Sequence, residues 1–85
     1  MDLTKISSKE RRAKFHMDLA RAFHGSGDEE NAVNAYRRAE GEARGRLYGS
    51  VYARETVTDL RDRLPRDGEA GRQVRDLAYR MNLSA

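Results

Sequence analysis

The chain contains no cysteine and no tryptophan, and it has only one proline. Without cysteine it can form no disulfide, and it offers no thiolate for a metal site or for nucleophilic catalysis. No run of about 18 apolar residues is present, so we expect no membrane-spanning segment. The first residues, Met1 to Thr4, lack the charged start and apolar stretch of a signal peptide. We therefore expect a cytoplasmic protein.

A basic block is also missing, although basic residues outnumber acidic ones by 17 to 14. The two signs are interleaved along the chain, whereas nucleic-acid-binding domains usually carry a concentrated basic stripe. Arg61, Arg63 and Arg66 could contact phosphates, but acidic residues lie near them. The pattern therefore does not favour direct nucleic-acid binding. The length of 85 residues predicts a single domain spanning residues 1–85.

Apolar residues recur at helical spacing in four segments, which predict helices at about 8–25, 29–43, 50–64 and 68–82. No segment alternates with a period of two, so we expect no strand. The fold class is predicted to be all-α, with two antiparallel helical hairpins. The predicted buried residues are His16, Leu19, Ala20 and Phe23 in the first helix, Ala32, Val33, Tyr36, Ala39 and Ala43 in the second, Leu47, Ala53, Val57, Leu60 and Leu64 in or beside the third, and Ala70, Val74, Leu77, Ala78 and Met81 in the fourth.

Helix starts are indicated by residues that can cap a free amide group. Ser7 is followed three residues later by Glu10, which is the spacing of a capping box. Asp28 is expected to cap the second helix, and Asp67 the fourth. We therefore expect each of these helices to begin directly after its capping residue.

Glycine and proline indicate where helices end. Glycines at 25 and 27 predict the end of the first helix, and Pro65 predicts the end of the third. The segment 41–50 contains three further glycines, each of which costs roughly 1 kcal/mol inside a helix. We predict a loop at about 44–49, with a mobile hinge or a frayed second helix as alternatives.

A positional pattern spans the first two predicted helices. Its members are Leu19, Ala20 and Phe23, then Gly27 and Asp28, then Ala32, Tyr36 and Ala39. In this pattern residues 13–44 resemble a tetratricopeptide repeat, a helical unit of roughly 34 residues. His16 departs from the large aromatic residue that the family favours, and Arg44 stands in place of its helix-ending proline. The resemblance implies helical hairpins whose first helices line a concave binding surface.

A second resemblance rests on four stretches, at 6–13, 18–22, 54–60 and 77–81. They look like the C-terminal region of actinobacterial transcriptional regulators, which carry a helix-turn-helix of the Cro/repressor type followed by a tetratricopeptide-like region. The sequence from Met1 onward shows no such helix-turn-helix, so we expect either a fragment of a longer regulator or a naturally short relative. The resemblance therefore implies a bacterial interaction or sensing module linked to transcription regulation, and it does not imply DNA reading by these residues.

The implied concave surface would be basic. Its third-helix part follows from aligning Val57 and Leu60 with Ala20 and Phe23. A basic surface favours an acidic peptide or a chain-terminal carboxylate as partner, while a purely solvated face is the alternative. The residues at the implied positions are Lys14, Met17, Arg21 and His24 in the first helix and Arg54, Thr58 and Arg61 in the third.

Self-association is the competing hypothesis. Two hairpins are fewer than the three or more repeats that usually close a solenoid core, so a second copy could cover one end. Tyr48, Tyr52 and Tyr79 lie outside the main apolar stripes and could form such a dimer interface. We therefore expect a homo-oligomer if no other partner covers these residues.

Catalytic and metal-binding patterns are weak in this sequence. His16 and His24 are eight residues apart, which separates them by about 12 Å along a helix. They therefore cannot share one metal ion, and no glycine-rich phosphate loop follows a predicted strand. We predict a non-enzymatic protein with no catalytic residues, no cofactor and no metal.

Overall fold

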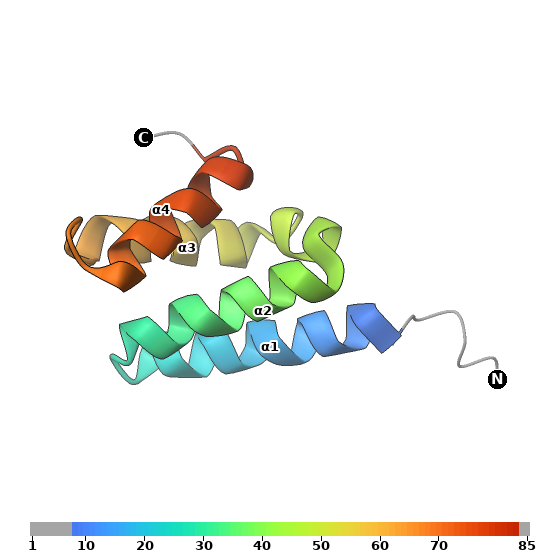
Figure 1. Cartoon of the computed structure of the whole chain (residues 1–85). Helices are drawn as coiled ribbons and strands as arrows, with labels where there is room; N and C mark the ends of the chain where they lie inside the picture. The colour runs from blue at the N-terminus through green and yellow to red at the C-terminus, as the bar shows by residue number, and fades with distance from the viewer. Residues whose placement is uncertain (1–7, 84–85) are drawn as a thin grey trace, which may run out of the picture.

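The computed structural model describes residues 8–83, which form four helices joined by short turns (Figure 1). The helices are α1 (Ser8–Gly25), α2 (Glu29–Tyr48), α3 (Val51–Arg63) and α4 (Glu69–Arg80). No strand occurs within the described part of the chain. The predicted all-α class with four helices is therefore confirmed.

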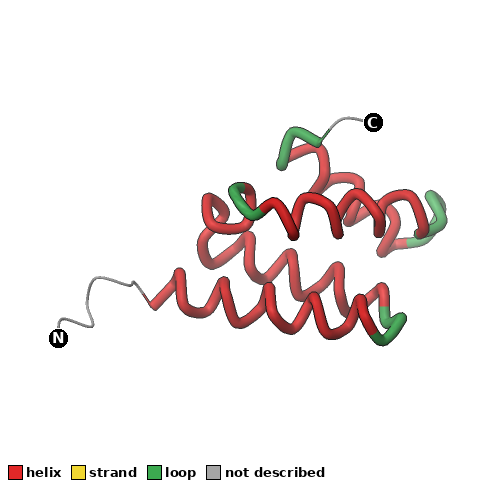
Figure 2. Tube along the Cα trace, turned by 180° about the vertical axis from the view of Figure 1, so that it is seen from behind, coloured by secondary structure: helices red, strands yellow, loops and turns green. Residues whose placement is uncertain are grey.

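The helices are arranged in two pairs, with α2 at the centre. α1 and α2 lie side by side and run in opposite directions, and α4 crosses α3 in the second pair (Figures 1 and 2). α2 packs against all three other helices, and α1 also contacts α3. The hydrophobic core lies between the pairs. Its largest fully buried side chains are those of Tyr36, Leu47, Leu60, Leu77, Met81, Val33, Val57 and Val74.

Most of the predicted core is confirmed, and half of the exceptions lie on α1, the others being Ala43, Leu64 and Ala70. Ala20 is fully buried, but His16, Leu19 and Phe23 are only partly buried. These three residues lie at the edge of the core, because α1 packs within residues 8–83 only on the side of α2 and α3. Ala13, one turn earlier, is fully buried and was not among the predicted core residues.

The turn between α1 and α2 follows the predicted signals. Gly27 has a φ of +82°, a left-handed conformation that costs glycine little. The amide of Asp28 donates to the Phe23 carbonyl oxygen at 2.9 Å, which is part of a Schellman motif. The Asp28 side chain accepts a hydrogen bond from the Asn31 amide, so Asp28 caps α2 as predicted. Ser7 of the predicted capping box lies outside the described residues.

The predicted loop at about 44–49 is wrong. α2 continues to Tyr48, and its only irregular residue is Ala43, whose φ and ψ are −156° and 83°. The chain resumes a helical turn beyond this break because that turn buries Leu47 completely. Burying a leucine side chain contributes about 1.5–3 kcal/mol, which offsets the propensity cost of the neighbouring glycines. The turn beyond the break leads directly to Ser50, whose side chain caps α3.

The turn between α3 and α4 is partly as predicted. α3 ends at Arg63, and Leu64 has the extended conformation that a following proline requires, with ψ at 140°. The predicted cap at Asp67 is wrong, since Gly68 is the N-cap of α4 and no side chain caps this helix. The turn is closed instead by the backbone, where the Gly68 amide donates to the Pro65 carbonyl oxygen.

Candidate functional site

A hollow surface runs between α1 and the junction of α2 with α3. One hollow of about 480 Å³ is lined by Lys14, Met17 and Asp18 on one side and by Gly45, Arg46, Gly49 and Ser50 on the other. A smaller hollow of about 160 Å³ shares Met17, Asp18 and Ser50 and continues to Arg21, Tyr36, Tyr52 and Ala53. Because they share residues, the two hollows form one surface, which we call the α1–α3 groove.

The inner end of the α1–α3 groove is closed by a cation–aromatic contact. The Arg21 guanidinium lies 4.6 Å from the centroid of the Tyr52 ring, and Tyr52 is 46% exposed. Such a contact contributes about 0.5–1 kcal/mol at an exposed site. It holds an arginine and a tyrosine together where both remain accessible to a partner.

A buried hydroxyl lies beneath this contact. Tyr36 is 1% exposed and lines the groove, and its hydroxyl has no hydrogen-bond partner within residues 8–83. The neighbouring Thr56 hydroxyl donates to the Tyr52 carbonyl oxygen at 2.9 Å. A tyrosine hydroxyl is already protonated at neutral pH, and burial raises the pKa of Tyr36 further, against a smaller lowering effect of the neighbouring Thr56 hydroxyl.

Lys14, Met17 and Arg21 are brought together in the α1–α3 groove as the sequence predicted. Lys14 also forms an ion pair with Asp18 one turn later, with Nζ and Oδ2 3.2 Å apart. Both side chains are more than half exposed, so this pair contributes only a few tenths of a kcal/mol. The lysine can therefore exchange this partner for another carboxylate at little cost.

His24 lies apart from the groove, at the end of α1. Its Nε2 is 2.8 Å from Oδ2 of Asp59 on α3, and Arg63 approaches the same carboxylate at 3.3 Å. The hydrogen bond with His24 is the main cause that lowers the pKa of Asp59. His24 therefore connects α1 with α3. The sequence had predicted that it would bind a partner.

The predicted α3 residues do not lie beside α1. Arg54 donates to the carbonyl oxygens of Tyr48 and Met81, at 3.3 and 3.0 Å. The Thr58 hydroxyl donates to the Arg54 carbonyl oxygen at 2.8 Å, one turn back along α3. Arg61 lines a separate hollow near the α3–α4 turn. The structure therefore does not join these three residues to Lys14, Met17 and Arg21.

The misplacement has a simple geometric cause. Arg54, Thr58 and Arg61 share one flank of α3, while Tyr52 and Asp59, which contact α1, lie about half a turn away. The apolar stripe between these flanks is buried as predicted. Periodicity identifies the buried direction of a helix, but it does not say which flank faces a neighbour. That choice depends on the turn that leads from α2 into α3.

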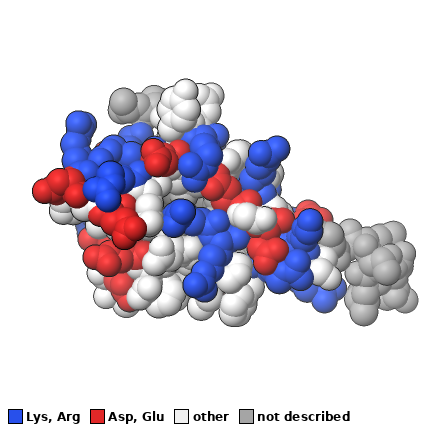
Figure 3. Space-filling view, viewed as in Figure 1, with Lys and Arg blue, Asp and Glu red and all other residues white. Residues whose placement is uncertain are grey.

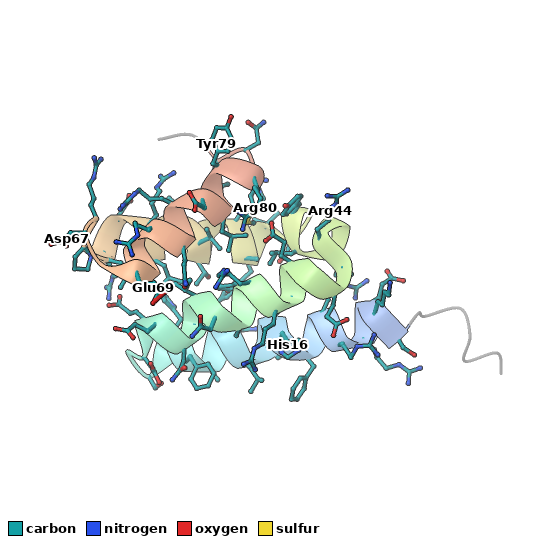
Figure 4. All side chains as sticks on the ribbon, viewed as in Figure 1. His16, Arg44, Asp67, Glu69, Tyr79 and Arg80 are labelled. Atoms are coloured by element: carbon teal, nitrogen blue, oxygen red, sulfur yellow. The ribbon has the colours of Figure 1, made fainter. Side chains whose placement is uncertain are left out.

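A polar junction joins α2 and α4 on the other side of the core. Arg80 donates two hydrogen bonds to the Glu40 carboxylate, at 2.7 and 2.8 Å, and the Tyr48 hydroxyl donates to the same carboxylate. In Figure 4 the Arg80 side chain lies over the space between α4 and α2. These residues are separated by up to 40 positions in the chain. No local pattern in the sequence could have paired them.

The junction supports a prediction on stability. Hydrogen bonding to Arg80 lowers the pKa of Glu40, so the folded state favours the ionised carboxylate. Its stabilising effect is present above the ordinary pKa and is lost as the pH falls through the lowered value. We expect Glu40→Gln to lower the free energy of unfolding by about 1.5 kcal/mol at neutral pH and by much less at a pH below the lowered pKa of Glu40. Urea unfolding followed by circular dichroism at both pH values measures this.

Glu55→Gln is the matched control for this prediction. Glu55 is exposed on α3 and forms no ion pair within the described residues, so its replacement removes the same charge without touching the junction. Equal losses of stability in the two variants would contradict a specific role of Glu40.

The three tyrosines of the predicted dimer interface have different surroundings. Tyr48 belongs to the polar junction and is only partly exposed, and Tyr52 lies in the α1–α3 groove. Tyr79 is 86% exposed and points away from the body of the molecule in Figure 4. The structure therefore does not gather the three residues on one surface.

The charged side chains are mixed on the surface as they are in the sequence. Lysine and arginine side chains alternate with aspartate and glutamate over the face formed by α4 and α2 (Figure 3). Within residues 8–83, no group of three or more histidine or acidic side chains could hold a metal ion. No helix in this part of the chain is long and apolar enough to cross a membrane.

Comparisons of the chain with models of protein families, with curated proteins and with solved structures find no match. The functional argument therefore rests on the α1–α3 groove and on the residues that line it.

Proposed function

We propose that this chain is a non-enzymatic protein-interaction module that binds an acidic peptide or protein segment in the α1–α3 groove. The observation that carries the proposal is that Arg21 contacts an aromatic ring and pairs with no carboxylate of the described residues. Its guanidinium lies on the Tyr52 ring and forms no ion pair with a carboxylate within residues 8–83. Arginine and tyrosine are the residue types enriched where protein partners bind most tightly.

The other groove residues favour a partner with negative charge. Lys14 and Arg46 contribute two cations to the rim, against the single carboxylate of Asp18. Among residues 8–83, Arg46 forms one ion pair, a long contact of 3.9 Å to Glu10, and it is about half exposed. A carboxylate entering the groove can form charge-assisted hydrogen bonds with these cations. The apolar side chain of Met17 offers a contact for a neighbouring apolar residue of the same segment.

The resemblances support the biological setting of this proposal. We interpret the two helical pairs as tetratricopeptide-like, and the chain as the interaction or sensing region of a bacterial transcriptional regulator. In that setting the partner is a protein or peptide segment, and DNA is read elsewhere. The interleaved charges on the surface agree with a protein partner more than with a nucleic acid.

Homodimerisation is the second candidate function. The exposure of Tyr79, at 86%, is the observation that favours it. A dimer that depends on this residue would leave the α1–α3 groove free. The two functions therefore predict that substitutions at different residues impair binding: at Tyr79 for a dimer, and in the α1–α3 groove for an acidic partner.

Charge reversal in the groove tests the proposed function. We expect Lys14→Glu/Arg21→Glu to weaken binding of a short labelled peptide of alternating glutamate and leucine by about tenfold, equivalent to about 1.4 kcal/mol. The reason is that two attractive charges become repulsive, whereas the helical content is unchanged because both residues are exposed. Fluorescence anisotropy measures the affinity, and circular dichroism the helicity. The unaltered chain and this variant can then serve as baits that capture natural partners from a lysate.

Lys9→Glu/Arg11→Glu is the matched control. Both residues are exposed on α1 outside the groove, and the change in net charge is identical. If both variants lose affinity equally, binding is a general charge effect and the groove is not the site. If neither variant loses affinity and the baits capture only further copies of this chain, homodimerisation replaces the proposed function.

A further inference from the structure

A second hollow, of about 330 Å³, lies between the end of α3 and α4, away from the α1–α3 groove. It is lined by Arg61, Asp62, Leu64, Arg66 and Arg75, and we call it the arginine hollow. Its three arginines come from α3, from the turn and from α4. Figure 4 shows this turn, marked by Asp67, at one end of the molecule. The reversal of the chain after Pro65 brings these residues together.

Arg75 is held in place, but one of its donors is unused. Its Nη2 donates to the Arg66 carbonyl oxygen at 2.6 Å, which fixes the guanidinium against the turn. Its Nη1 is buried and has no hydrogen-bond partner within residues 8–83. Burying a cationic donor without an acceptor costs free energy, because its hydrogen bonds to water are lost and no other hydrogen bond replaces them. Arg75 also lines the hollow, so its fixed guanidinium places one positive charge beside it.

The charge balance of the hollow also favours an anion. Within residues 8–83, the lining of the hollow includes three guanidinium groups and one carboxylate, that of Asp62, which lies 3.5 Å from Nε of Arg61 and is 68% exposed. The Arg61 side chain is only 15% exposed, so its charge lies partly inside the protein. Guanidinium groups pair with phosphate and carboxylate oxygens through directed hydrogen bonds. The number and positions of the guanidinium groups then decide whether phosphate or carboxylate fits better.

We propose that the arginine hollow binds the phosphate group of a small phosphorylated molecule. Arginines from three separate chain segments surround the hollow, and a tetrahedral phosphate presents oxygens in several directions, whereas a carboxylate presents only two in one plane. A volume of about 330 Å³ lies within the usual range for small-molecule sites. On the face that Figure 3 shows, basic and acidic side chains are mixed and form no continuous basic track for a nucleic-acid backbone. The site is therefore expected to be local and confined to this end of the molecule.

A titration of the full chain tests this site. Sodium phosphate, glycerol phosphate and sodium acetate are added separately at constant ionic strength, and the arginine Nε–Hε signals are followed by NMR. We expect both phosphates to shift the Arg75 signal to saturation, and acetate to shift it weakly and without saturation. Arg66→Gln should weaken phosphate binding by about tenfold, because it removes one charge-assisted contact. This variant keeps the Arg66 carbonyl oxygen that anchors Arg75, so the fold is preserved.

Arg72→Gln is the matched control on α4. Arg72 is exposed, donates to the Asp67 carbonyl oxygen and does not line the arginine hollow. We expect this variant to keep phosphate affinity within about twofold, because only general screening changes. Equal weakening in the two variants, or equal affinity for acetate and phosphate, overturns the proposal in favour of a general anion effect. Binding of a short DNA duplex without binding of either phosphate also overturns it, in favour of a nucleic-acid interface.

Discussion

Replacing Gly71 with alanine is expected to lower the free energy of unfolding by about 3 kcal/mol, the upper end of the usual cost of overpacking. Gly71 is buried in the first turn of α4, where an added Cβ would overlap the Pro65 carbonyl oxygen and lie 2.9 Å from the Pro65 carbonyl carbon. These are backbone atoms of a closed turn, so they cannot move aside as a flexible side chain would. Urea unfolding followed by circular dichroism measures the loss.

Gly41→Ala provides the opposite expectation with the same chemical change. Gly41 is exposed within α2, and an added Cβ would have no atom within 4 Å. Alanine should stabilise the helix there by about 0.5–1 kcal/mol, since it restricts the unfolded chain. If Gly71→Ala were as stable as Gly41→Ala, the close approach of α4 to Pro65 would be refuted.

Leu47→Ala is expected to cost about 3 kcal/mol, within the range of 2–5 kcal/mol for buried leucines. Leu47 is fully buried although it lies beyond the break in α2, in the segment that the sequence predicted as a loop. Truncation would remove its buried methyl groups and leave a cavity in the hydrophobic core. The free energy of unfolding from urea titrations measures this effect.

The control for Leu47 is Val51→Ala, only four residues later. Val51 is 70% exposed, so its truncation should change the stability by no more than about 0.5 kcal/mol. A loss below about 1 kcal/mol for Leu47→Ala would mean that the last turn of α2 is not docked on the core. The loop predicted from the glycine content would then be the better description.

Local signals in the sequence predicted those helix boundaries at which a single residue determines the backbone conformation or the cap. Gly27, Asp28 and Pro65 each act through their own backbone or side chain, and each acts in the structure as predicted. The glycine-rich segment was mispredicted because its local cost is outweighed by the burial of Leu47, a distant contact. Asp67 was mispredicted because Gly68 takes the capping position that either residue could have filled.

The candidate site was predictable only in its α1 half. Lys14, Met17 and Arg21 follow from the spacing of one helix, and they share one groove. Tyr52 completes that groove, yet the sequence suggested it for a dimer interface, because its contact with Arg21 depends on how α3 is rotated. The unpartnered donor of Arg75 also had no signal in the sequence, since burial of a single atom is a tertiary property.

Arg54 shows why composition overstates how basic this molecule is toward a partner. Its guanidinium donates to the carbonyl oxygen of Tyr48, the last residue of α2, and to that of Met81, the C-cap of α4, so the negative ends of two helices meet at one cation. A dipole end is equivalent to about half an elementary charge, so two of them offset roughly one full positive charge. The formal net charge of +3 counts Arg54 in full and neither helix end. The field near this junction is consequently closer to neutral than a count of side chains suggests.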